Sequence, residues 1–109
     1  MPEVVESYKF KYYVIQTHTF AGATITGFLK AKYLHVINFI YLTDIWINFW
    51  DSLTPGTGKV LIDDFYFGTI PERDTKTLIF NCELDYGLSW KMSGGSVNTG
   101  DIIVTYLER

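Results

Sequence analysis

Hydrophobic and polar residues alternate with a period of two along much of the chain, and turn residues interrupt the alternation at short intervals. Residues 8–19 show this pattern first and are expected to form a strand. Lys9 and Lys11 fall on one face of that strand, and the other carries four apolar residues, namely Tyr8, Phe10, Tyr12 and Val14. Because side chains of a strand point alternately to its two sides, the apolar face is expected to point toward a core.

Six further strand segments follow, bounded by loops that contain glycine, proline, asparagine or aspartate. Residues 28–41 are rich in β-branched and aromatic side chains and are expected to form one or two strands, with a kink near residues 30–32. Residues 55–58 read Pro-Gly-Thr-Gly and predict a turn. The other strands are expected at 44–51, 59–67, 77–82, 87–92 and 102–107, and the segment 87–92 is expected to open with a bulge at Gly87.

No stretch of the sequence has the three- and four-residue spacing of an amphipathic helix. Short strands separated by turns at intervals of roughly 8 to 15 residues are typical of two-layered β-proteins. The sequence therefore predicts an all-β fold: a single antiparallel β-sandwich domain over residues 1–109, jelly-roll-like, with seven or eight strands.

The composition supports a folded domain with an unusual surface. Hydrophobic residues make up 48% of the 109 residues and charged residues 19%, which is far from the composition of disordered chains. Aromatic residues reach 17%, more than a core of this size can enclose. Several aromatic side chains are therefore expected at the surface or in an interface between subunits.

Charge and hydropathy exclude several classes of partner. The net charge is −3 and no segment gathers lysines and arginines, so a nucleic-acid partner is not expected. The most apolar region, residues 33–50, is interrupted by His35, Asn38, Asp44 and Asn48 and does not read as a membrane span. Residues 1–6 carry two acidic and no basic side chains, which does not match an ordinary secretory signal. A soluble protein without a membrane partner is expected.

Candidate catalytic and metal-binding residues are few. His18 and His35 are 17 residues apart and have no second histidine or cysteine at metal-ligand spacing. The single cysteine, Cys82, follows Ile79 and Phe80 and reads as a buried small residue. No nucleophile elbow and no glycine-rich phosphate loop is present. The sequence therefore predicts no enzyme activity, no cofactor and no metal.

Carboxylates gather at two places. Asp63 and Asp64 are adjacent in a strand and should point to opposite faces, whereas Glu83 and Asp85 would share a face. Together with Asp101 they could form a glycosidase pair or a calcium site. The favoured interpretation is that they are solvated charges that keep strand edges from pairing with other chains.

Trp46, Asn48 and Trp50 lie on one face of a predicted strand, with the two rings about 13 Å apart. Two flat rings with a polar group between them could stack on sugar rings, pack in the core or anchor a subunit interface. Ile45, Ile47 and Phe49 fill the opposite face, so we expect a strand covered on both sides and buried tryptophan rings. The candidate interface or ligand platform therefore consists of Trp46, Asn48 and Trp50, together with the third tryptophan, Trp90.

Four segments, residues 33–38, 44–51, 87–90 and 100–106, together resemble a family of viral proteins. The family comprises the small β-sandwich virion structural proteins of tailed bacteriophages and related viruses, which decorate or cement the capsid or join other virion parts. The resemblance spans residues 33–107. It implies a place in the virion and an assembly role without catalytic residues.

The leading hypothesis is therefore a virion structural protein that self-associates, with a trimer or another closed ring favoured, and docks on a capsid or other virion protein. The first alternative is a carbohydrate-binding module that binds glycans through Trp46 and Trp50. A weaker third hypothesis is a small hydrolase built on Glu83 and Asp85.

Overall fold

Eight strands and no helices make up the described elements of the computed structural model, which describes residues 9–16, 24–67, 74–94 and 100–109. The strands are β1 (Lys11–Gln16), β2 (Thr24–Leu29), β3 (Ala31–Leu42), β4 (Ile45–Asp51), β5 (Lys59–Phe67), β6 (Asp74–Glu83), β7 (Leu88–Gly94) and β8 (Asp101–Glu108). The all-β prediction is confirmed. No described segment forms a helix that could span a membrane.

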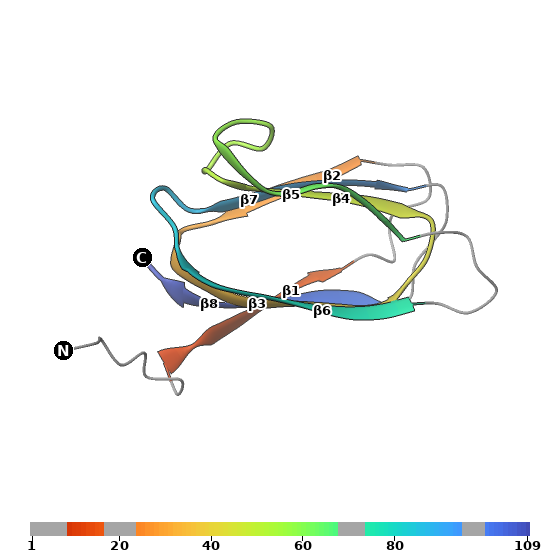
Figure 1. The fold of residues 1–109 in the computed structure, drawn as a ribbon, viewed down its shortest axis with the longest axis horizontal. Helices are drawn as coiled ribbons and strands as arrows, with labels where there is room; N and C mark the ends of the chain where they lie inside the picture. The colour runs from red at the N-terminus through yellow and green to blue at the C-terminus, as the bar shows by residue number, and fades with distance from the viewer. Residues whose placement is uncertain (1–8, 17–23, 68–73, 95–99) are drawn as a thin grey trace.

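The strands form two four-stranded sheets that lie face to face (Figure 1). Sheet A has the order β1-β8-β3-β6 and sheet B the order β2-β7-β4-β5, with every described pair antiparallel. A chain folded once into a long hairpin, with its tip between β4 and β5, would form four of the observed strand pairs. These are β1–β8, β2–β7, β3–β6 and β4–β5. Rolling that hairpin up adds the pairs β3–β8 and β4–β7. This strand order is that of a jelly roll, as predicted.

The loop at the tip of this hairpin is the expected turn at residues 55–58. Thr57 donates its backbone N–H to the carbonyl oxygen of Thr54 at 3.2 Å. Gly58 has a φ of +82°, and a Cβ atom there would lie 2.6 Å from the carbonyl oxygen of Asp51. A glycine is therefore required where the loop returns to β5.

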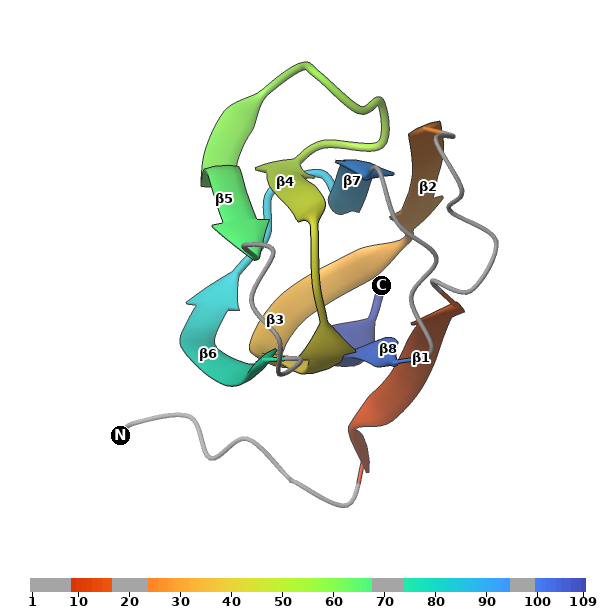
Figure 2. The ribbon, with the colours of Figure 1, turned by 90° about the vertical axis from the view of Figure 1, so that its right-hand side faces the viewer.

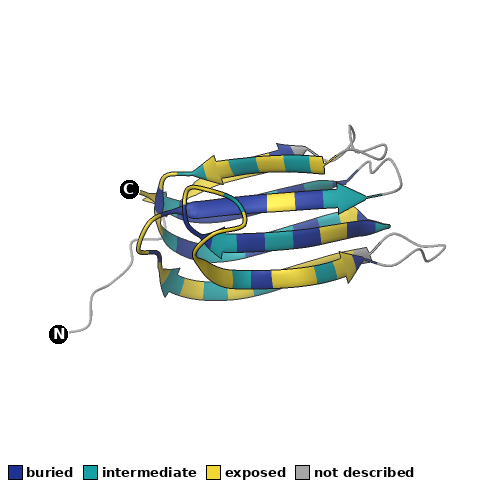
Figure 3. Cartoon of the chain, turned by 90° about the horizontal axis from the view of Figure 1, so that it is seen from above, coloured by how far each residue is buried: buried dark blue, intermediate teal, exposed yellow. Residues whose placement is uncertain are grey.

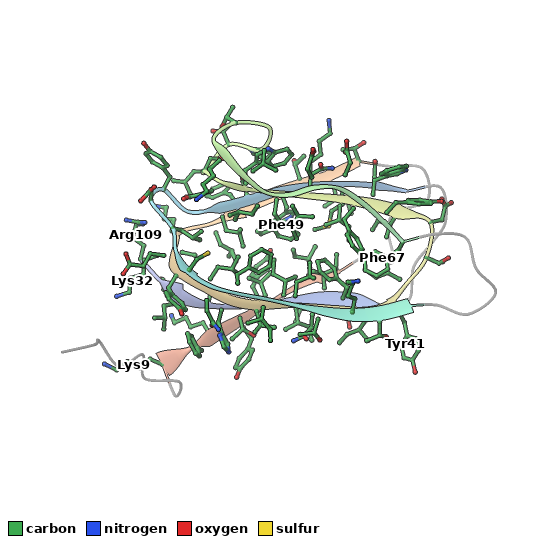
Figure 4. The ribbon with its side chains drawn as sticks, viewed as in Figure 1. Lys9, Lys32, Tyr41, Phe49, Phe67 and Arg109 are labelled. Atoms are coloured by element: carbon green, nitrogen blue, oxygen red, sulfur yellow. The ribbon has the colours of Figure 1, made fainter. Side chains whose placement is uncertain are left out.

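The core lies between the two sheets. Figure 2 shows the two layers in a view along the strands. Phe49 and Phe67 point into this space from sheet B (Figure 4). Phe39 of sheet A meets Phe67 with ring centroids 5.4 Å apart. The fully buried side chains of largest volume are Phe39, Phe49, Leu34, Ile37, Leu42, Ile45, Ile47, Leu88, Met92, Ile102 and Val104. Burial of each such side chain stabilises the fold by about 1.5–3 kcal/mol.

β1 turns the opposite face to the core from the one that its sequence predicts. Ile15 is 4% exposed and points inward, whereas Tyr12 is 70% and Val14 46% exposed. The register with β8 explains the difference, because Tyr13 pairs with Val104 and Ile15 with Ile102, whose side chains are buried. Residue 8 and residues 17–19 of the predicted first strand lie outside the described residues.

The predicted break near residues 30–32 is real: β2 ends at Leu29, and β3 begins at Ala31 in the other sheet. Gly87 directly precedes β7 with a φ of +155°. A Cβ atom there would lie 2.5 Å from Leu53 Cδ2 and 2.9 Å from the carbonyl oxygen of Leu29. This glycine lets three segments converge at one end of the sandwich.

Candidate functional site

Trp46, Asn48 and Trp50 all lie on the outer face of sheet B, because β4 buries its other four side chains, Ile45, Ile47, Phe49 and Asp51. Trp46 is 44% exposed, and Asn48 and Trp50 are half-buried. The expectation that β4 is covered on both sides is wrong for the single chain. The sandwich has only two layers, so each sheet packs on one face, and Figure 3 shows the outer face of sheet B from above.

Trp90 does not belong to this group, which corrects the predicted four-residue platform. It is 2% exposed and points from β7 into the core. Its ring lies over Gly27, where a Cβ atom would be 2.6 Å from Trp90 Cζ2. Phe49 and Tyr13 flank it, with ring centroids 5.9 Å and 5.6 Å away. Trp90 is a core residue whose space depends on a glycine in the neighbouring strand.

An exposed aromatic pair that sequence analysis missed lies beside Trp46. Trp46 and Tyr66 of β5 are cross-strand neighbours with ring centroids 4.4 Å apart and planes 26° apart. The Tyr66 hydroxyl donates to Asp44 Oδ1 at 2.8 Å, and this hydrogen bond raises the pKa of Tyr66. The hydrogen bond to Asp44 holds the ring of Tyr66 against the indole of Trp46. The pairing depends on the β4–β5 register, which the residue spacing does not reveal.

A polar row crosses the centre of the outer face of sheet B. Lys91 of β7 lies between Thr26 of β2 and Asn48 of β4, and its side chain is exposed. Asn48 accepts a hydrogen bond from the Asp64 backbone N–H at 2.8 Å. We call Trp46, Asn48, Trp50, Tyr66 and Lys91 together the tryptophan face.

Asp63 and Asp64 are both exposed, so the expected alternation between opposite faces fails here. Asp64 has a φ of +47°, and the β4–β5 register shifts between Ile47 and Phe49. Such an irregularity inserts an extra residue and re-aims the side chains that follow.

The outer face of sheet A carries two rows of side chains that cross all four strands. The first row contains cross-strand neighbours Tyr12, Thr105, Val36 and Ile79. The second contains Val14, Ile103, Asn38 and Thr77. None of the eight is charged, and six are β-branched. We call these two rows the apolar face.

Beside the apolar face, His35 contacts other side chains rather than a metal-ligand set. Its Nδ1 is hydrogen-bonded to Asn81 Oδ1, and Phe10 stacks on the imidazole with centroids 4.7 Å apart. Among the described residues, no three histidine, cysteine, aspartate or glutamate side chains are placed to hold a metal ion. His18 lies outside the described residues.

The second carboxylate group lies at the end of β6. Glu83 is the last residue of that strand, Asp85 lies in the connector to β7, and both are exposed. Asp101, the third residue of the suggested site, begins β8 and is half-buried. Cys82 is also half-buried, and burial raises the pKa of its thiol.

Asp51, which sequence analysis did not single out, ties this connector to sheet B. It is 4% exposed and accepts backbone hydrogen bonds from Asp85, Tyr86 and Gly87 at 2.9, 3.0 and 3.4 Å. Burial raises the pKa of the Asp51 carboxyl, but the three N–H donors and Lys59 outweigh it, so its pKa lies below the ordinary value. The role of this carboxylate is to hold a loop.

Comparisons of the chain with protein families, with curated proteins and with solved structures found no match. The strand order and the two outer faces are therefore the features from which a function can be inferred.

Proposed function

We propose that the protein is a structural component of a virus particle, a jelly-roll subunit that associates with copies of itself and docks on a capsid or other virion protein. The strand order of the two sheets carries this proposal. Eight-stranded jelly rolls are building blocks of viral capsids, and the same architecture occurs in lectins and cupins. The resemblance of residues 33–107 to virion proteins favours the first of these classes.

The exposed apolar side chains support an assembly role within that architecture. Tyr12 and Ile79 are each 70% exposed, and they belong to one row of the apolar face. Burial of apolar surface is favourable by about 25 cal/mol per Å², so a partner that covers this face stabilises both chains. Exposed apolar surface of this kind commonly marks interaction sites.

Two measurements test the proposal. Light scattering coupled to size exclusion should give a mass above that of one chain at micromolar concentration, and a monomer at every concentration would contradict it. Mass spectrometry of purified virus particles should detect the chain at a fixed ratio to the major capsid protein. Its absence from the particles would contradict the virion location.

Carbohydrate binding is a second candidate function, favoured by the pair of Trp46 and Tyr66. A sugar ring presents an apolar C–H face and several hydroxyl groups, so it needs flat aromatic surface beside hydrogen-bonding side chains. The tryptophan face offers both, with Asn48 and Lys91 adjoining the aromatic pair. Stacking and the bond to Asp44 also pre-order the rings, which lowers the entropy cost of binding.

Isothermal titration with cellohexaose and with chitohexaose tests this second function. Binding that Trp46→Ala abolishes and Phe28→Ala preserves would support it. Phe28 is 54% exposed on the same outer face but lies in the row of Ser89 and Trp50, not in the row of Trp46 and Tyr66, so it controls for the need for the aromatic pair itself. Equal loss in both variants, or no heat with either sugar, would count against it.

A further inference from the structure

We propose that the apolar face binds the apolar face of a second copy of this chain, so that two sandwiches stack sheet A to sheet A about a two-fold axis. The inference rests on the proposed function, because it names the surface through which copies associate. None of the eight side chains in the two rows is charged, although the rows cross the whole sheet. Depletion of charge is characteristic of interface centres.

Two pairs of polar side chains in and beside the apolar face are hydrogen-bonded within the chain. Thr77 donates its hydroxyl to Asn38 Oδ1 at 2.7 Å, within the second row. His35 and Asn81 are hydrogen-bonded to each other next to the first row. A buried polar group is costly when it lacks a partner. These pairs lower the cost of covering the face, because a partner need not supply their hydrogen bonds.

Charged side chains lie at the margin of the same sheet. Lys11 at the start of β1 forms an ion pair with Glu108 at the end of β8, and both are exposed. Figure 4 shows Lys9, Lys32 and Arg109 at this end of the molecule, with Tyr41 at the other. An apolar centre with a polar rim is the usual arrangement of a protein interface.

The area of the outer face of sheet A suits a modest dimer in which the two rows form the centre of the contact. Four strands about 4.8 Å apart, each with about seven residues of roughly 3.3 Å, give the whole sheet a plane on the order of 440 Å². With side-chain relief, each copy would bury on the order of 600 Å², so the total reaches the lower end of stable interfaces, about 1,200 Å². We expect a dimer that dissociates on dilution.

A second copy fits this face because the contact is self-complementary. Sheets pack face to face at about 10 Å through alternating apolar side chains, and the outer rows resemble the inner rows in their β-branched composition. A flat patch used by both copies is an isologous contact and closes at two chains. The geometry therefore favours a dimer over the trimer expected from the sequence. The tryptophan face does not have an uncharged centre of this kind, because Lys91 lies in its middle row.

The test compares two lysine substitutions that change the net charge equally. Ile79→Lys lies on β6 in the apolar face, at an edge of sheet A, and Phe28→Lys lies on β2 at an edge of sheet B. Both native side chains are largely exposed, so both variants should fold, and circular dichroism checks this. Sedimentation equilibrium of the parent and of both variants then gives the dissociation constant of each.

We expect the parent to be a dimer and Phe28→Lys to form a dimer with the same Kd. The Kd of Ile79→Lys should increase by at least about tenfold, because the new ammonium would be buried in the contact without a partner. Val14→Lys, in the other row, should act in the same way. If Phe28→Lys dissociates the assembly and both apolar-face variants do not, the apolar face is not the contact surface, although the protein still self-associates. A parent trimer would overturn the two-fold arrangement. A monomeric parent would contradict self-association itself.

Discussion

The two outer faces belong to equivalent four-stranded sheets, yet they expose different chemistry. On sheet A two adjacent rows pass over four strands without a charge, and the exposed residues include Tyr12 and Ile79. On sheet B the aromatic side chains are separated by a row that holds Lys91 and Asn48. The difference shows that cross-strand neighbours, more than the residues of any one strand, decide what a sheet face can bind.

The comparison also separates the aromatic residues by role. Trp90 and Trp46 lie on adjacent strands of sheet B, but Trp90 is 2% exposed and Trp46 is 44% exposed. The first contributes to folding through its contacts with the core, whereas the second leaves a large part of its surface open to another molecule. Substitutions can separate these two roles or disturb the framework that keeps the two faces apart.

The largest effect is expected from Trp90→Ala, which should lower the free energy of unfolding by about 3–5 kcal/mol because it leaves a cavity between the sheets. Trp46→Ala should lower it by only about 1 kcal/mol, mainly through the lost contact with Tyr66. Urea denaturation measures both values. Equal losses would mean that the inner and outer tryptophans do not differ in role.

Asp51→Asn should lower the free energy of unfolding by about 2 kcal/mol at neutral pH, because a charged acceptor of three backbone N–H groups is lost. The folded-state pKa of Asp51 lies below its ordinary value of 3.8. Its contribution is therefore present above that value and is lost as the pH falls through the folded-state pKa.

Urea denaturation of the parent and of Asp51→Asn at several pH values checks this prediction. The difference between the two proteins should shrink as the pH falls from 7 toward about 2. A constant difference would show that the charge of Asp51 does not hold the connector between the sheets.

Gly27→Ala should lower the free energy of unfolding by about 1–3 kcal/mol, since the new Cβ atom would lie 2.6–2.8 Å from three atoms of the Trp90 ring. The ring must shift, and the near-ultraviolet circular dichroism should change with it. Thr26→Ala is the control, because its side chain points outward from the same strand. A Gly27→Ala protein as stable as the parent would show that the core under sheet B adapts readily.

The smallest effect concerns the tryptophan face itself. A double-mutant cycle with Trp46→Ala and Tyr66→Ala should give a coupling energy of about 0.5–1.5 kcal/mol, as expected for an aromatic pair. The cross-strand pair Val36 and Ile79 on the apolar face should give about 0.2–1 kcal/mol when measured in the monomer. Absence of coupling between Trp46 and Tyr66 would remove the argument that the exposed rings are pre-ordered.

The sequence alone determined most of the local structure. Period-two alternation and turn residues located most of the strands, including the alternating β4 and the break near residue 30, because both signals depend only on neighbours along the chain. They missed most of β2, since residues 24–27 precede the predicted segment 28–41. The same alternation placed Trp46, Asn48 and Trp50 on one side of β4, as the structure does. It also excluded helices from the expected fold.

Only the tertiary structure decided which side of each strand meets the core. Alternation divides β1 into two faces that both carry apolar side chains, and the register with β8 turns Ile15 into the core and places Tyr13, which is 41% exposed, against Trp90. Trp90 is internal because Gly27 lies opposite it in the adjacent strand. The two rows of the apolar face form because four strands from distant parts of the chain bring uncharged residues into line. Such contacts depend on strand order and register, which residue spacing within a single strand does not encode.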